Sequence, residues 1–266
     1  MSGLSLVSQP PTTVPILCLR GSETRPTSIP SRRCSRCRTA SHSNSSSSPK
    51  VRNSTFSHRS HRSCVFELPM FPLGTNVFPM EVLPLQIFEP RYVQLIAEVQ
   101  DRPEMDFGVV LIDRGSEVGG GDVRTMVGTR VVILEAQEVV EDRWVVAAAG
   151  VERIDVVSWL PDDPFPRATV QPRPRADNGG DLESAEMTVR ESIAVSLEIA
   201  GVEQEPSLTF SDDPLERLDQ LSAISPLSAF DRQQILEATT THDQIDSLRA
   251  LVNDKLELLR ATRDAG

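Results

Sequence analysis

The residue types that could bind a metal gather near the N-terminus. Cys34 and Cys37 stand three positions apart, and His42, His58 and His61 follow them. This spacing is of the kind found in zinc sites with thiolate and imidazole ligands. The flanking residues are Arg and Ser, with no strand or helix pattern to fix a tetrahedral geometry, and every cysteine lies before residue 65. We therefore expect no metal site in the chain and no disulfide scaffold beyond residue 64.

Groups for acid–base, phosphate or nucleophilic chemistry are sparse after residue 64. Asp162-Asp163 and Asp212-Asp213 each precede a proline, which favours turns and helix starts over a carboxylate pair converging in a cleft. The Gly-rich stretch from Ser116 to Asp122 leads into another predicted strand, so a hairpin loop is favoured over a phosphate cradle. His242, the one histidine of this region, falls in the first turn of a predicted helix. We expect no catalytic residue and no cofactor.

Charge is divided unevenly along the chain. Residues 1–64 hold nine Arg and one Lys against the single acid Glu23, a net of +9, so the remainder carries −20 of the total of −11. The acidic remainder lacks the clustered cations of a nucleic-acid binder and would be repelled by anionic lipid. No apolar run approaches the ~18 residues that a membrane span requires. We expect neither DNA nor a membrane as a partner.

Residues 1–64 are rich in Ser, Arg, Thr and Pro and show no hydrophobic period. This composition cannot bury enough apolar surface to offset ordering entropy, so the segment is predicted to be disordered. Two interpretations stay open. Arg- and Ser-rich, acid-poor N-termini are typical of organelle transit peptides. The favoured interpretation is that translation starts near Val65 and the segment lies outside the mature protein, because no amphipathic helix pattern accompanies the composition.

Short strands come first among the elements that would position any site. Apolar and alternating runs predict strands over 66–71, 82–88, 106–113, 129–140, 143–149, 152–160 and 167–171. Glu89-Pro90 opens a helix after the second strand, Glu141-Asp142 predicts a hairpin turn, and Gly150 predicts a bend between two strands. The prolines in the first two strands cannot donate ladder hydrogen bonds, so these strands are expected to be edges or bulged.

Helices follow the strands. Residues 173–180, rich in Pro, Gly and Asp, predict a linker. Beyond it, helices are predicted over 182–199, from Asp213-Pro214, from Ser225-Pro226 and from Thr241, where Thr241 and Gln244 have the spacing of a capping box. The chain is therefore expected to be of the α+β class, with a β domain over 65–172 and a small C-terminal helical bundle over 181–262.

A long motif gives a family resemblance. The segments LPMFPL at 68–73, VFP at 77–79 and LPLQIFEPRY at 83–92 together resemble the opening of the substrate-binding domain of the Lon proteases. The resemblance covers about residues 66–260. It implies a PUA-like, partly open β barrel followed by a helical subdomain, and it implies recognition of unfolded or tagged protein segments.

The family's ATPase and Ser-Lys peptidase domains are not expected in this chain. Lys50 follows Pro and Lys255 follows Asp, so no Gly-Lys-Ser/Thr phosphate loop is present, and Lys255 is expected on the surface of the last helix. The chain also ends about where the family's ATPase would begin.

We expect a stand-alone, non-enzymatic, cytoplasmic protein-binding module that serves proteolysis or protein quality control. Its partners would be unfolded or tagged clients and a protease or chaperone. An RNA-binding PUA-like role and a structural oligomerisation role stay open. A plastid or other organelle is the alternative location if residues 1–64 are a transit peptide.

Holding a client requires an exposed apolar patch. The expected contact residues are Phe78, Met80 and Leu83 at the Pro-rich turn, since Met in particular suits an adaptable surface; the alternative is that all three close the barrel. A structural role is expected for the family motif that follows, in which the acid begins the helix and the tyrosine ring packs on the barrel. These residues are Phe88, Glu89, Pro90, Arg91 and Tyr92.

Overall fold

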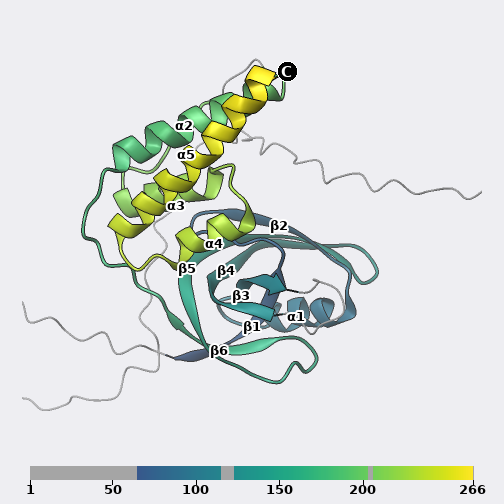
Figure 1. Cartoon of the computed structure of the whole chain (residues 1–266). Helices are drawn as coiled ribbons and strands as arrows, with labels where there is room; N and C mark the ends of the chain where they lie inside the picture. Colours follow the sequence, from purple (N-terminus) through teal and green to yellow (C-terminus); the bar gives the residue numbers. More distant parts are fainter. Residues whose placement is uncertain (1–64, 115–122, 203–205, 266) are drawn as a thin grey trace, which may run out of the picture. The chain divides into compact units, whose positions relative to one another are not determined.

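Six strands and five helices form in the part of the chain that the structure describes, residues 65–114, 123–202 and 206–265 of a computed structural model (Figure 1). All belong to one unit, Phe56–Gly266. Strands come first and most helices follow, as predicted. The elements are β1 (Phe66–Leu73), β2 (Val82–Ile87), α1 (Pro90–Gln100), β3 (Asp106–Arg114), β4 (Val123–Val140), β5 (Arg143–Trp159), β6 (Arg167–Pro172), α2 (Leu182–Ile199), α3 (Pro214–Ile224), α4 (Ala229–Glu237) and α5 (Thr241–Ala265).

The strands form one mixed sheet in the order β2-β5-β4-β3-β1-β6, and β5 also pairs with β6. β1 and β3 run parallel, and the other pairings are antiparallel. The long strand β5 pairs with β2 through its first half and with β6 through its second half. The pairings close β5, β4, β3, β1 and β6 into a ring. Such a ring is not in itself a barrel, so the PUA-like, partly open barrel stays a prediction.

The prolines of the first two strands lie where a missing N–H is tolerated. Pro84 is in the middle of β2, whose one partner among the described strands is β5. β1 lies inside the sheet order, but Phe66–Pro69 pair with β6 and Met70–Leu73 pair with β3. Each half of β1 therefore pairs with a neighbouring strand on one side only. A proline there does not interrupt hydrogen bonding between two flanking strands.

β5 corrects the prediction of two strands separated by a bend at Gly150. One strand runs from Arg143 to Trp159, and the register shift opposite Arg130 and Val131 falls at Gly150. A Cβ at Gly150 would lie 2.1 Å from the carbonyl oxygen of Phe78, so glycine serves the close approach of another backbone. The hairpin turn before β5 is confirmed, with Asp142 at φ 59°.

Two helix starts also differ from the predictions. Ser228, not Ser225, caps α4, in a reciprocal capping box with Asp231. At α5 the hydroxyl oxygen of Thr240 accepts from Asp243 N–H at 3.1 Å. Gln244 does not close a box with Thr241, because its buried amide bonds to α3 instead. Helix α2 has the predicted bounds, with Asp181 at its N-cap.

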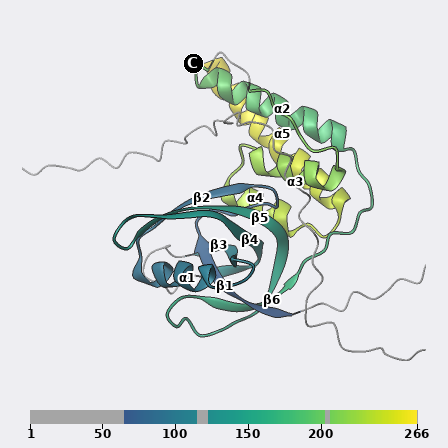
Figure 2. The same cartoon turned by 180° about the vertical axis from the view of Figure 1, so that it is seen from behind.

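Three apolar clusters make up the core. One packs α1 against the sheet, and a second fills the space among β1, β3, β5 and β6. The third lies among α2, α3, α4 and α5, with α2 and α5 side by side in Figures 1 and 2, and it includes Phe78 and Val127 from the strand region. The strand region therefore enters the helical core at two points, the turn before β2 and Val127 of β4.

Candidate functional site

The motif over residues 88–92 joins β2 to the start of α1, and its structural role stays a prediction. Pro90 is the first residue of α1, and Glu89 is at the N-cap position. The Glu89 side chain makes no cap hydrogen bond; it accepts from Arg91 Nε at 3.1 Å. The Tyr92 ring is buried and stacks on Phe71 with 4.1 Å between centroids. Phe88 stays exposed at the end of β2. The Tyr92 ring therefore packs α1 against the sheet.

The three predicted contact residues do not form one exposed patch. Phe78 is 0 % exposed, in the core among the helices, and Leu83 is buried against the sheet core. The two corrections have different causes: Phe78 packs among the helices, and Leu83 points inward because it pairs with the buried Ala148. Met80 alone is open to solvent, 49 % exposed. Client contact by Met80 stays a prediction.

The turn that carries Met80 is held rigidly. Met80 has φ 69°, and its N–H donates to Gly150 O at 3.0 Å. Gly150 N–H donates back to Glu81 O at 2.9 Å. Two backbone hydrogen bonds thus fix the turn to β5, and the side chain between them points outward.

A polar cluster ties the same turn to α4. Arg232 donates to Glu81 at 2.7 Å and to the side-chain oxygen of Asn76 at 3.0 Å, and its guanidinium lies 5.1 Å from the Phe78 ring centroid. Glu81 also accepts from Phe78 N–H at 2.8 Å. Burial raises the pKa of Glu81 above its ordinary value, against the opposing effects of Arg232 and the Phe78 N–H. The cluster holds the turn against the helices.

Beside Met80 lies a hollow of about 270 Å³, which we call the Met80 hollow. It is bounded by the turn, the middle of β5, the segment after β6 and the start of α3. Part of its lining is apolar, and part is charged. The apolar residues are Pro79, Met80, Val151 and Leu215.

Three arginines form the charged lining together with Glu152, Glu216 and Asp219. Arg173 donates to Asp155 at 2.6 Å, and Arg175 donates to Asp219 at 2.6 Å. Arg153 is 5 % exposed and donates to Leu236 O and Ala238 O at the end of α4. Carbonyls at a helix C-terminus carry partial negative charge, so they stabilise this cation.

Arg153 is the most perturbed cation of this hollow. Burial lowers its pKa to about 10, and the neighbouring charge of Arg175 acts in the same direction. A guanidinium with that pKa remains charged at neutral pH. The hollow therefore has charged side chains of both signs beside an apolar wall.

The arginines of the Met80 hollow are absent from the sequence-based candidates. They lie at positions 153, 173 and 175, and the segment after β6 was predicted as a linker. Its backbone bonds to the helical region instead, with Ala176 N–H donating to Thr239 O at 3.0 Å. The alternation Pro-Arg-Pro-Arg at 172–175 is the one local signal that could have drawn attention to them.

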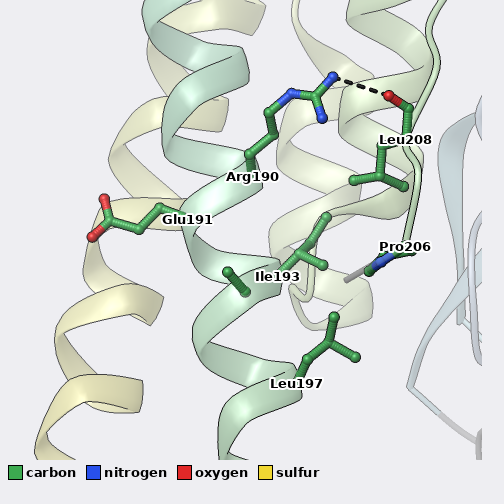
Figure 3. Close-up of a pocket in the computed structure, with 7 residues that line it drawn as sticks. Arg190, Glu191, Ile193, Leu197, Pro206 and Leu208 are labelled. Atoms are coloured by element: carbon green, nitrogen blue, oxygen red, sulfur yellow. Dashed lines mark hydrogen bonds between the residues drawn. The ribbon is translucent and has the colours of Figure 1, made fainter. Parts of the chain in front are cut away.

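A second hollow, of about 260 Å³, lies along α2 (Figure 3). Ile193, Leu197, Pro206 and Leu208 line it, and Arg190 reaches over to donate to Leu208 O at 3.1 Å. Figure 3 shows Glu191 directed away from these residues. The apolar walls hold no convergent polar groups, so we assign no chemistry to this hollow.

The remaining sequence candidates show no catalytic arrangement. Asp162 pairs with Arg124 at 2.6 Å, and Asp213 caps α3. His242 lies 3.3 Å from Asp246 on an exposed helix surface. The loop from Ser116 to Asp122 and the cysteines lie outside the described residues. Within the described ranges no His, Cys, Asp and Glu group has the arrangement of a metal site, and no helix is long and apolar enough to cross a membrane.

Comparison with known families decides the assignment. The model of the "ATP-dependent protease La (LON) substrate-binding domain" matches residues 67–254. The chain belongs to this family. The match spans β1 to α5 and so includes both the strand region and the helices. The resemblance inferred from the motif at 68–92 is therefore confirmed.

The chain is similar to only a part of each of its Lon protease relatives. The chain is 25 % identical over 204 residues to a Lon protease of Desulfosudis oleivorans, covering 73 % of this chain and 24 % of that protein. It is 27 % identical over 204 residues to a Lon protease of Anaeromyxobacter dehalogenans, with the same shares covered. The chain thus spans about a quarter of the length of these relatives.

Solved structures of Lon N-terminal domains share the fold. A Lon N-terminal domain protein from Xanthomonas campestris aligns with TM-score 0.50 and 22 % identity, over 70 % of this chain and 98 % of that one. The N-terminal domain of a Mycobacterium avium complex Lon protease aligns with TM-score 0.52 and 16 % identity, over 72 % and 98 %.

Proposed function

We propose that this Lon-family chain is a non-catalytic protein-binding module that holds unfolded or tagged protein segments, alone or as an adaptor for a protease or chaperone. The match to the substrate-binding domain over residues 67–254 carries the proposal. The matched relatives are proteases, and the region shared with them is the substrate-binding domain. We include in the proposal a cytoplasmic location, a β domain over 65–172 and a helical subdomain over 181–262.

An exposed apolar strip supports client binding. Met80, Val82 and Val151 are 49, 51 and 39 % exposed. Met80 and Val151 line the same hollow, and Val82 pairs with Ala149 two residues before Val151. Contiguous apolar side chains on a rigid strand surface offer an extended segment an apolar contact at little ordering cost.

The acidic charge of the chain favours protein over RNA as the ligand. Beyond residue 64 the net charge is −20, which opposes the approach of a phosphate backbone. We therefore retain protein binding as the function.

The test is binding of a permanently unfolded protein to the full chain. Reduced, carboxyamidomethylated α-lactalbumin should bind, and native α-lactalbumin should not. Met80→Asn, a residue type that accepts the positive φ, should weaken binding about tenfold by removing one apolar contact. Met187→Asn, on an exposed part of α2, is the matched control. Equal binding of native and unfolded protein, or turnover of ATP or casein by the pure chain, would refute the proposal.

A further inference from the structure

Strand β2 has one free side. β5 is its one partner among the described strands, and no backbone hydrogen bond joins β2 to a described helix. Gly150 N–H of β5 donates to the carbonyl oxygen of Glu81 at 2.9 Å, so the backbone of Glu81 faces β5. The N–H and C=O groups of successive strand residues point to opposite sides, so every second residue of β2 directs them away from β5. These residues are Val82, Pro84 and Gln86.

Pro84 supports this orientation. A proline that faced β5 would leave a carbonyl oxygen of β5 without its donor, whereas on the free side the missing N–H interrupts no ladder. The free side keeps the N–H groups of Val82 and Gln86 and the carbonyl oxygens of all three residues. All three residues are exposed. Donors and acceptors with this spacing form a template for another extended backbone.

The side chains of the same three residues lie on an exposed and largely apolar face of the sheet. Their partners on β5 are apolar too: the pairs are Val82 with Ala149, Pro84 with Ala147, and Gln86 with Val145. Val82 and Val145 are exposed, and so is Phe88 directly after β2. The solvated face of antiparallel strands is usually polar, so this face offers contacts to the apolar side chains of a ligand.

The hairpin that joins β4 to β5 adds negative charge beside this face. It carries four acids and one cation, a net charge of −3: Glu135, Glu138, Glu141, Asp142 and Arg143. Glu135 pairs with Ala147 of the same face. Glu138 accepts from Asp142 N–H at 3.1 Å, and none of the four acids forms an ion pair within the described ranges. The charge therefore favours a ligand that has cations beside its apolar residues.

We propose that the free side of β2 binds an extended client segment as an added antiparallel strand, with apolar side chains at alternate positions and cations at the ends of the segment. This inference rests on the proposed function and names the chemistry that it recognises. Backbone hydrogen bonds to Val82, Pro84 and Gln86 give the affinity. The apolar face and the charge of the hairpin select the side chains.

A second copy of the chain fits the free side less well than a client does. In a two-fold pairing of β2 with β2, the donor that Pro84 lacks is lost twice, because both strands carry the proline. Two hairpins of the same negative charge also repel each other. A client segment meets the missing donor once and can carry cations.

Calorimetric titration of the full chain with N-methylated peptides tests for strand addition. The parent peptide is acetyl-Lys-Val-Thr-Val-Thr-Val-Lys-amide; one derivative is N-methylated at two valines and the other at both threonines. In antiparallel addition the residues whose side chains lie on the apolar face also direct their N–H groups to β2. Methylation of the valines should therefore weaken binding at least tenfold, and methylation of the threonines should leave the affinity within about twofold. Equal effects of the two derivatives, or a larger effect of threonine methylation, would overturn the inference.

The charge of the peptide tests the contribution of the hairpin. Replacing both lysines by glutamate should weaken binding about threefold in about 20 mM salt, and the difference should vanish in about 0.5 M salt. The preference is small because the added strand would lie roughly 10 Å, two strand spacings, from β5, a distance over which salt screens exposed charges. A glutamate peptide that binds as tightly as the lysine peptide at low salt would contradict the proposed ligand chemistry.

A substitution in β2 locates the effect. Pro84→Ala supplies a third N–H on the free side and should tighten binding of the parent peptide about fivefold. Pro161→Ala removes an exposed proline outside the sheet, and it should leave the affinity unchanged. Unchanged or weaker binding by Pro84→Ala would show that the peptide does not add to β2. A wild-type dimer in sedimentation that the parent peptide dissociates would assign the free side to a second copy instead.

The outcomes also separate this inference from the function beneath it. If the two methylated peptides bind equally while unfolded α-lactalbumin still binds, the inference fails and the protein-binding function stands. If the wild type binds no unfolded protein at all, the proposed function itself fails, whatever the small peptides do.

Discussion

Gly150 shows at the scale of one residue how the binding surface is fixed. The carbonyl oxygen of Phe78 approaches so closely that an added Cβ would lie 2.1 Å away, and the atoms it meets are backbone. Backbone cannot give way as a side chain can, so the turn and β5 are in contact only because this position has no side chain.

Gly150→Ala should therefore destabilise the protein by about 2 kcal/mol through overpacking. Urea unfolding measured by circular dichroism gives the free energy of unfolding. Ala147→Ser on the outward side of the same strand is the control, and it should stay within about 0.5 kcal/mol of wild type. Equal stability of Gly150→Ala and wild type would show that the turn does not pack as described.

Glu81 makes stability depend on pH. Burial raises its pKa in the folded protein above 4.5, so the folded state holds the proton over a pH window in which the unfolded state has lost it. The stabilisation that the raised pKa of Glu81 gives to the folded state is thus complete below about pH 4.5, and it is lost as pH rises through the folded pKa. Glu81→Gln does not titrate, and the stability advantage of wild type over Glu81→Gln should narrow as pH rises.

Urea unfolding of both proteins at several pH values from 4.5 upward checks this sign. An advantage of wild type that widens with pH would mean that Arg232 outweighs burial and lowers the pKa of Glu81.

At the scale of elements, capping decides where α4 begins. Ser228 accepts from Asp231 N–H at 3.2 Å, and Asp231 accepts from Ser228 N–H at 3.3 Å. Ser228→Ala should cost about 1 kcal/mol, because one helix-end N–H loses its partner. Thermal melts check it against Ser158→Ala on an exposed part of β5. A loss no larger than that of the control would assign the start of α4 to packing alone.

An element could be predicted from the sequence where the interactions that fix it are local, and not where they join residues distant in the sequence. The bounds of α2 were predictable because Asp181, the helical period and Gly201 are local signals. β5 was divided wrongly at Gly150, because the reason for that glycine is Phe78, far away along the chain. The sequence pattern placed the start of α4 at Ser225-Pro226, but the Ser225 hydroxyl donates to Leu221 O at the end of α3, and Ser228 makes the capping box with Asp231.

The candidate site was predicted in part for the same reason. Met80 follows from the exposed, Pro-rich turn, but burial of Phe78 depends on helices more than a hundred residues later in the sequence. The three arginines of the Met80 hollow are unremarkable in the sequence, and their meeting depends on the β5–β6 pairing and on α3.

At the scale of the whole molecule, Arg232 joins strands to helices. It lies on α4 and donates to Glu81 and Asn76 of the turn, next to Phe78, which packs in the core cluster among the helices. Removing one partner of a buried ion pair costs about 3–5 kcal/mol, because the remaining charge stays uncompensated. This loss of stability is expected where α4 meets the turn before β2, and not within the core clusters.

Arg232→Met should therefore speed amide hydrogen exchange in α3 and α4 while β3 and β4 keep their protection. Arg260→Met, which breaks an exposed pair with Glu191, should change neither region. Adding Glu81→Leu to Arg232→Met should restore part of the lost protection, because no lone charge then remains in the junction. If exchange instead rises equally in the strands and the helices, residues 65–172 and 181–262 open as one cooperative unit, and the proposed division into two subdomains fails.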